Sequence, residues 1–194
     1  MIRFGEEKRV YNLNRPQYKA IKYLPDFPGK VIDVGAGLGE FGDMLRRHKI
    51  EPMLIDGNED FMESTRKRGF TSYVCDFENE RFPFNDNTFN VAIMLDVIEH
   101  IWNRYLFFNE VKRILKNNGL LIVSTINYNY WRYRWLHLLG NHEKYTRDTR
   151  YKRLYTLNTF KDFIGDYFEI QDVIVDSFFP NLLSQKVFIK ARKI

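Results

Sequence analysis

The sequence alternates short apolar runs with segments of helical pattern, and this alternation restricts the chain to few folds. The runs are rich in β-branched and other apolar residues, and each is short enough to be a single strand. Such alternation predicts β-α units arranged around a mostly parallel sheet, which is a doubly wound α/β fold. The runs lie near residues 30–34, 52–56, 71–75, 90–95 and 120–126.

Helix signals occupy the segments between these runs. In "NEDFMESTRKRGF", Asn58 can cap a helix that has acids in its first turn, bases in its last turn and Gly69 at its end. A second helix is predicted in "NRYLFFNEVKRILKNNG", where Gly119 can end it. Its predicted apolar stripe comprises Leu106, Val111, Ile114 and Leu115.

The pattern changes after the fifth run. A helix is predicted near residues 157–165, and two further strands near 168–176 and 184–192. Only a short loop region with Phe, Pro and Asn separates the two strands, so we expect an antiparallel pair that joins the edge of the parallel sheet.

Length and composition favour one globular domain over residues 1–194. A chain of 194 residues can bury a substantial core, and 44% hydrophobic with 28% charged residues is typical of globular proteins. No run approaches the ~18 consecutive apolar residues of a membrane span. The N-terminus is charged and lacks the features of a secretory signal, and the single cysteine, Cys75, cannot form an internal disulfide. We therefore expect a cytoplasmic protein.

The stretch "KVIDVGAGLGEF" places an acid and three glycines directly at the end of the first predicted strand. Glycines at this edge of an α/β sheet let the backbone approach a ligand closely. Residues 37–42 also fit the dinucleotide pattern GxGxxG, but if the strand ends at Val34, the turn begins at Gly35 and Gly42 falls within the helix. Asp33 would repel a pyrophosphate and attract a cationic amino group or sulfonium.

Acids recur at the ends of the predicted strands, at Asp33, Asp56, Asp76 and Asp96. Each has a simpler interpretation, since Asp residues commonly cap helices or lie in solvated loops. The aromatic ring of Phe77 is equally expected to fill the core. Their shared position favours a binding site, because the ligand of an open α/β sheet lies at this edge.

Residues 30–127 resemble the class I S-adenosylmethionine-dependent methyltransferases, through "VIDVGAGLGEF", "LIDGNED", "VCDFENERFPFNDNTFNVAI", "MLDVIEHI" and "VKRILKNNGLLIVSTIN" in the family's order. The closest subgroup is the small-molecule type that includes the ubiquinone-biosynthesis O-methyltransferases, although "GNE" and the closing segment differ from it. The resemblance implies a seven-stranded sheet with an antiparallel last strand, an S-adenosylmethionine cofactor, ribose contacts from Asp56 and adenine contacts from Asp76 and Phe77. The implied cofactor-binding residues are Asp33, Gly35, Ala36, Gly37, Gly39, Asp56, Asp76, Phe77 and Asp96.

A hydroxyl acceptor would need a base, and a histidine suits that task near neutral pH. His100 follows the fourth strand and is the predicted catalytic residue, although it could instead cap or pack under a neighbouring helix. Glu99 could bind a metal, but no ligand spacing supports a metal site, and none is predicted.

Residues 127–155 contain eight aromatic residues, seven Lys or Arg and only two acids. The rest of the chain has 23 basic and 23 acidic residues, so the net positive charge is confined to this segment. We expect a substrate lid inserted after the fifth strand. Three alternatives stay open: a surface for single-stranded RNA, a helix on a membrane surface, and a simple cover of the sheet edge. The predicted substrate-binding residues are Trp131, Arg132, Arg134 and His137.

The sequence thus predicts methyl transfer to a small-molecule acceptor, most readily at oxygen. RNA methylation, and cofactor binding without catalysis, are the alternative functions. Nothing in the sequence indicates an oligomeric state.

Overall fold

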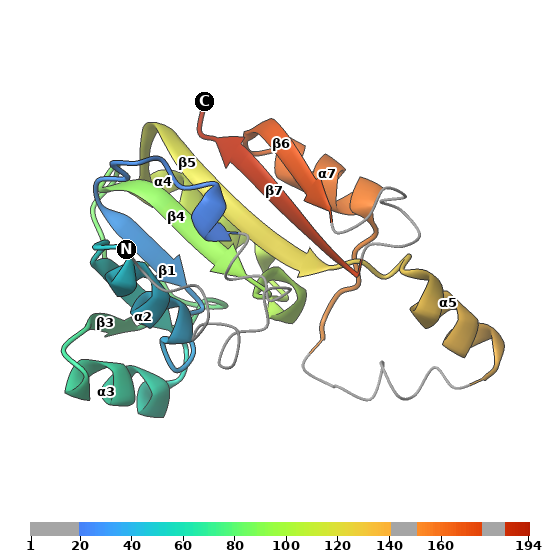
Figure 1. The fold of residues 1–194 in the computed structure, drawn as a ribbon, viewed down its shortest axis with the longest axis horizontal. Helices are drawn as coiled ribbons and strands as arrows, with labels where there is room; N and C mark the ends of the chain where they lie inside the picture. The colour runs from blue at the N-terminus through green and yellow to red at the C-terminus, as the bar shows by residue number, and fades with distance from the viewer. Residues whose placement is uncertain (1–19, 141–150, 176–184) are drawn as a thin grey trace, which may run out of the picture.

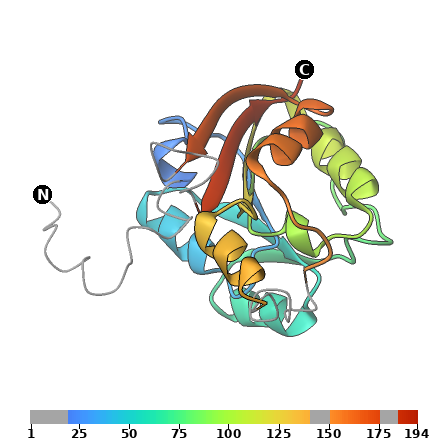
Figure 2. The same ribbon diagram turned by 90° about the vertical axis from the view of Figure 1, so that its right-hand side faces the viewer.

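The computed structural model describes residues 20–140, 151–175 and 185–194, which form a seven-stranded sheet with helices on both faces (Figures 1 and 2). The strand order is β3-β2-β1-β4-β5-β7-β6. Strands β1 to β5 pair in parallel, whereas β7 is antiparallel to both neighbours, so the predicted fold is confirmed. The strands are β1 (Val31–Val34), β2 (Pro52–Asp56), β3 (Thr71–Val74), β4 (Phe89–Leu95), β5 (Leu115–Ile126), β6 (Glu169–Val175) and β7 (Lys186–Arg192).

Alternation along β1 sends its side chains into two different cores. Ile32 and Val34 belong to a core that includes the buried sides of α4 (Arg104–Ile114) and α7 (Leu157–Gly165). Val31 belongs to the opposite core, with the apolar side of α2 (Glu40–Arg47). α3 (Glu59–Lys67) contributes to a smaller third core with β2. Helices cover both faces of the sheet. A ligand is therefore expected at the edge where the strands end, in contact with the loops that follow them.

Two helix predictions differ in outcome. The Asn58 cap is confirmed, because its side chain accepts a hydrogen bond from the Phe61 N–H at 3.0 Å. The predicted apolar stripe of the next helix is partly wrong. Leu106 is exposed, and Leu115 begins β5 rather than ending α4. The buried side of α4 is instead formed by Phe107, Phe108, Glu110, Val111 and Ile114.

The glycine turn follows the predicted register. Gly39, with φ 74°, directly precedes α2, and Gly42 lies inside that helix, where an added Cβ would come within 3.1 Å of Phe70. The backbone N–H groups of Gly35 and Ala36 donate to the Ile55 carbonyl, which ties the turn to β2. Gly42 therefore serves helix packing, and the ligand-facing turn is GxGxG.

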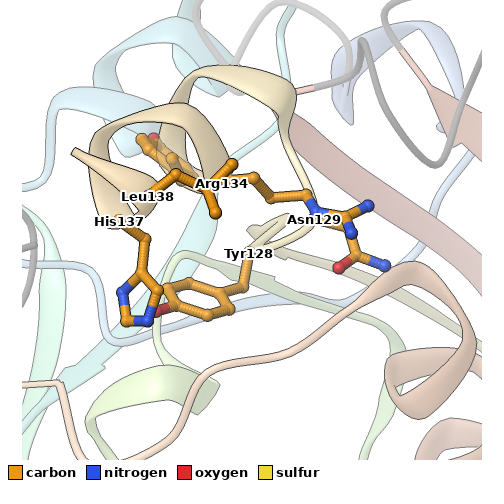
Figure 3. Close-up of a pocket in the computed structure, with 6 residues that line it drawn as sticks. Tyr128, Asn129, Arg134, His137 and Leu138 are labelled. Atoms are coloured by element: carbon orange, nitrogen blue, oxygen red, sulfur yellow. The ribbon is translucent and has the colours of Figure 1, made fainter. Parts of the chain in front are cut away.

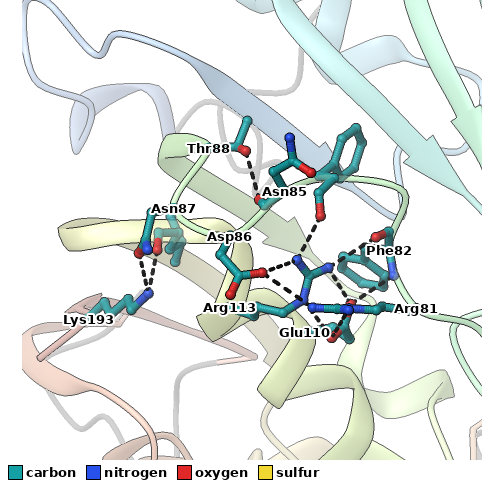
Figure 4. A network of polar contacts seen from close by, with 11 residues as sticks. Arg81, Phe82, Asn85, Asp86, Asn87, Thr88, Glu110, Arg113 and Lys193 are labelled. Atoms are coloured by element: carbon teal, nitrogen blue, oxygen red, sulfur yellow. Dashed lines mark hydrogen bonds and ion pairs between the residues drawn. The ribbon is translucent and has the colours of Figure 1, made fainter.

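A partly buried ion pair, between Glu110 and Arg113, holds the loop after β3 against α4 (Figure 4). Glu110 accepts hydrogen bonds from the Phe82 N–H at 2.8 Å and from Arg113 Nη2 at 2.6 Å. Arg113 also donates to the carbonyls of Phe82 and Phe84, at 3.0 and 2.7 Å. Phe82 packs on Phe77, with ring centroids 5.4 Å apart, so this network supports the loop that carries Phe77.

Glu110→Gln is expected to lower the free energy of unfolding by about 1–2 kcal/mol near neutral pH, because it removes a charged hydrogen bond while Asp86 still pairs with Arg113. Burial works against ionisation of Glu110, but the bonds from Arg113 and the Phe82 N–H lower its pKa overall. The folded pKa is depressed, so the stabilisation is present above the unfolded pKa and is lost as pH falls through the folded one. Urea unfolding at neutral and acid pH measures this.

The matched control is Glu63→Gln, which breaks an exposed pair with Lys67 on α3. Surface pairs contribute little, so the control should unfold like the natural protein at either pH. Equal stability of both variants at neutral pH would contradict the role given to Glu110.

Among the described residues, no helix combines the length and apolar character that crossing a membrane requires.

Candidate functional site

The carboxyl ends of β1, β2 and β4 meet at one edge of the sheet, with β1 between the other two. From β1 the chain adds β2 and β3 on one side, and it then adds β4 and β5 on the other side of β1. Such a switch point in the strand order, between the parallel neighbours β1 and β4, is where ligands bind in open α/β sheets. A pocket of about 460 Å³ opens there. Its lining residues are Gly35, Asp56, Gly57, Phe61, Phe77, Asp96, Val97, His100, Ile101 and Lys152.

Gly35, the first glycine of the turn, forms part of one wall of this pocket, whereas Gly37 and Gly39 do not line it. At Gly35, with φ 74°, an added Cβ would lie 2.4 Å from Val97, so no side chain fits. At Gly37, with φ 53°, an added Cβ would meet nothing within 4 Å, so the backbone there faces open space. The turn therefore has backbone that a ligand can approach closely.

Asp56 links this turn to the start of α3. Its Oδ2 accepts a hydrogen bond from the Gly37 N–H at 2.8 Å, and its Oδ1 accepts one from the Asn58 N–H at 2.9 Å. A carboxylate offers about four acceptor positions, so each oxygen retains a lone pair. Asp56 lines the pocket, and its predicted contact with a ligand remains a prediction.

Asp33 lies within β1, where it is 3% exposed, rather than beyond the strand end. Its Oδ2 has no hydrogen-bond partner among the described residues. Burial, and to a lesser extent the charge of Asp56, raise its pKa to about 7. It lines a cavity of about 120 Å³ with Gly35, Ala36, Glu40, Phe41 and Leu95. Gly35 lines both cavities, so the two adjoin.

Asp96 and Glu99 follow β4 and are held by groups from β5 and β7. Asp96, with φ 58°, accepts from Ser124 Oγ at 3.1 Å and forms an ion pair with Lys186. Glu99 is 1% exposed and accepts from Thr125 at 3.0 Å. Burial, and next the charge of Asp96, raise the pKa of Glu99 to about 7. No sequence pattern pointed to Lys186, because its strand is distant along the chain.

The two residues predicted for adenine lie differently. Phe77 belongs to the core and also lines the pocket, and its contact with an adenine remains a prediction. Asp76 is exposed and does not line the pocket; it accepts from the Asn79 side chain and the Glu78 N–H, at 2.8 and 2.9 Å. Those bonds lower its pKa. Phe61, on α3, lines the pocket and was not predicted.

His100 lies on the pocket rim at the end of the short 3-10 helix η2 (Ile98–His100). Its ring stacks on Tyr151, with centroids 5.1 Å apart and planes at 14°. The N–H groups of Lys152 and Arg153 donate to the Glu99 carbonyl, at 2.7 and 3.2 Å. These bonds fix the returning end of the 127–155 segment on the rim, and they bring Lys152 to the pocket.

The four predicted substrate-binding residues lie elsewhere, on α5 (Trp131–Leu138). Arg134 and His137 line a separate cavity of about 300 Å³ with Tyr128, Asn129, Tyr133 and Leu138 (Figure 3). Trp131 and Arg132 line neither this cavity nor the two at the strand ends. The helix extends beyond the end of β5, and residues 141–150, the next part of the predicted lid, lie outside the described residues (Figure 1). The lid remains a prediction.

Within the described ranges, no three or more His, Cys, Asp and Glu side chains are grouped so that they could hold a metal ion.

Comparison with known proteins agrees with this geometry. Residues 32–123 match the family model described as a methyltransferase domain. A Mycobacterium tuberculosis protein described as a "Probable S-adenosylmethionine-dependent methyltransferase" is 30% identical over 97 residues, which are 50% of this chain and 35% of that protein. The ubiquinone biosynthesis O-methyltransferase of Neisseria meningitidis is 29% identical over 143 residues, which are 70% of this chain and 59% of that enzyme. The chain thus spans about a third to three fifths of the length of these curated relatives.

Solved structures show the same fold. A Thermotoga maritima S-adenosylmethionine-dependent methyltransferase has a TM-score of 0.71 at 24% identity, covering 92% of this chain and 88% of that one. A counterpart from Archaeoglobus fulgidus has a TM-score of 0.69 at 19% identity, covering 97% of each chain. The predicted family is supported: residues 32–123 match a methyltransferase domain, and relatives at 30% and 29% identity are named as an S-adenosylmethionine-dependent methyltransferase and a ubiquinone biosynthesis O-methyltransferase.

Proposed function

We propose that this protein transfers a methyl group from S-adenosylmethionine to an oxygen atom of a small-molecule acceptor. The observation that carries the proposal is Asp33, a buried carboxylate with an unpartnered oxygen, beside a glycine turn and next to the larger pocket that Asp56 lines. Such a site suits a ligand with cationic centres and is unfavourable for a pyrophosphate. The similarity to ubiquinone O-methyltransferases supports the small acceptor and the oxygen by analogy.

The residues present fit the cofactor. Asp56 would accept hydrogen bonds from the ribose hydroxyls with its remaining lone pairs, and Phe61 and Phe77 would provide apolar contact for the adenine. Asp33 would attract the ammonium group from the adjoining cavity. When bound, S-adenosylmethionine supplies an activated methyl group, so the chain mainly has to align the acceptor and exclude water.

Affinity for S-adenosylmethionine is expected to rise about tenfold between pH 6 and pH 8. Protonated Asp33 offers no charge to a cation, and its pKa of about 7 makes the ionised fraction grow over this interval. The raised pKa means that ionising Asp33 costs stability as pH rises, and the bound cation offsets this cost. Isothermal titration calorimetry across this pH range measures the slope.

Asp33→Asn should flatten that slope and leave weak, pH-independent binding. Three other acids require attention, since Asp56 and Glu40 face the same region and Glu99 also has a pKa of about 7. Glu99→Gln is therefore the matched control and should keep the slope. A slope that persists in Asp33→Asn would assign the pH dependence to another group.

The acceptor would lie between the cofactor wall and the rim formed by His100, Tyr151 and Lys152. His100 would remove the acceptor proton, and the stacked ring of Tyr151 would orient the imidazole. The Lys152 cation on the rim favours an acceptor with an anionic group. An acceptor screen with matched anionic and neutral hydroxyl compounds tests this part of the proposal.

The same screen separates the alternative functions. Transfer to RNA that weakens steeply with salt would support RNA methylation. Tight cofactor binding without transfer to any acceptor would favour a binding protein.

A further inference from the structure

Helix α5 exposes all of its side chains to some degree. None of its residues is buried, and the helix extends from the body beyond the end of β5 (Figure 1). A short helix of this kind gains little stability from its own hydrogen bonds, so helices usually depend on packing of an apolar side. The side of α5 that would pack is left uncovered among the described residues.

The uncovered side is a stripe of large apolar residues, Trp131, Trp135, Leu138 and Leu139, which we call the α5 stripe. Their spacing of four, seven and eight residues after the first places them on one face of a helix. Their exposed fractions are 46%, 58%, 79% and 58%. Leu138 also lines the cavity of about 300 Å³, together with Tyr133, Arg134 and His137 (Figure 3). The other three residues of the stripe do not line it.

Positive charge flanks this stripe. At about 100° per residue, Arg132 lies on one side of it and Arg134 on the other. Residues 127–140 contain no Asp or Glu. Arg side chains can bury their stems beside apolar groups and direct their charged ends to the phosphates of a lipid surface. Tryptophan is the residue type enriched where a membrane meets water.

We propose that the α5 stripe inserts into the headgroup region of a membrane that contains anionic lipids. Charge favours this occupant over a second copy of the chain, because pairing two such helices would bring arginines together without a carboxylate on either. RNA could stack on the tryptophans, but Leu138 and Leu139 would remain exposed to water. At a lipid surface the tryptophans and leucines can be buried in the apolar boundary, while the arginines bind lipid phosphates. This inference does not depend on methyl transfer.

Cosedimentation of the full chain with phospholipid vesicles tests the proposal. The natural protein should bind vesicles of phosphatidylcholine with phosphatidylglycerol and bind pure phosphatidylcholine much more weakly. The double variant Trp131→Ser with Trp135→Ser should lose roughly tenfold or more in affinity for the anionic vesicles, because it removes two large apolar side chains from the contact. The double variant Arg132→Gln with Arg134→Gln should lose roughly thirtyfold and also the preference for anionic lipid, at ~1 kcal/mol per Arg.

Phe27→Ser is the matched control, since Phe27 is 95% exposed and lies outside α5. It should bind vesicles like the natural protein, and all variants should keep the natural thermal unfolding temperature, because the exchanged side chains are exposed. Trp135→Phe should retain binding.

Three results would overturn the proposal. The first is absence of vesicle binding, or binding that the α5 variants leave unchanged. The second is a dimer of the natural protein, in sedimentation velocity, that the tryptophan variant dissociates without any vesicle binding. The third is RNA binding that the same variant abolishes while lipid binding is absent.

Discussion

Asp56→Ala is expected to weaken S-adenosylmethionine binding by about 3 kcal/mol, roughly 100-fold in Kd, with the fold intact. The variant removes two proposed hydrogen bonds from the ribose hydroxyls to a charged group. It also frees the Gly37 N–H, which Asp56 holds at 2.8 Å, so the glycine turn loses its link to the start of α3. Isothermal titration calorimetry gives the affinity, and thermal unfolding reports on the fold.

Asp60→Ala is the matched control for charge. Asp60 is exposed in the first turn of α3, close to Asp56 in the sequence, and it does not line the pocket. It should bind the cofactor with nearly natural affinity. Asp56→Asn keeps one acceptor oxygen, so its affinity for the cofactor should lie between the affinities of Asp56→Ala and Asp60→Ala. Natural affinity in Asp56→Ala would mean that the ribose lies elsewhere.

His100→Ala is expected to lower kcat by roughly 100-fold, the lower end of what a general base contributes, while cofactor affinity stays near natural. The second readout is the pH dependence of kcat, whose acidic limb should disappear when the base is removed. A residue that only supported the rim would lower activity without changing the shape of that profile. The measurement is steady-state kinetics with an acceptor found in the screen.

Two controls accompany this variant. His48→Ala removes an exposed histidine at the end of α2 and should leave kcat unchanged. Glu99→Gln tests whether the neighbouring buried acid, rather than His100, causes the pH dependence of kcat. This variant should keep the acidic limb of the profile. If the acidic limb remained in His100→Ala and disappeared in Glu99→Gln, the result would contradict His100 as the general base.

The succession of strands and helices along the chain and the glycine register could be predicted because they depend on local patterns. Alternating apolar runs determine β-α units, and the end of β1 at Val34 fixes which glycines form the turn. The face of α4 was less predictable, because Leu106 and Phe107 are both apolar and only tertiary packing decides which is buried. The same limit applies to Leu115, which continues into β5.

The site was predictable where it follows strand ends and unpredictable where distant segments meet. Asp56 and Asp96 lie at the pocket because parallel strands end at one edge. Lys152 reaches the same pocket where its backbone N–H donates to the Glu99 carbonyl, a contact that no sequence pattern encodes. The burial that raises the pKa of Asp33 likewise depends on α2 packing over β1.

Calorimetric titration of the natural protein with S-adenosylmethionine, S-adenosylhomocysteine and NAD tests the central claim most directly. Binding of both adenosyl ligands, with no heat from NAD, is the predicted result, because Asp33 attracts a cation and repels a pyrophosphate. NAD binding in place of the adenosyl ligands, or silence from all three in folded protein, would contradict the assignment of the two adjoining cavities to this cofactor.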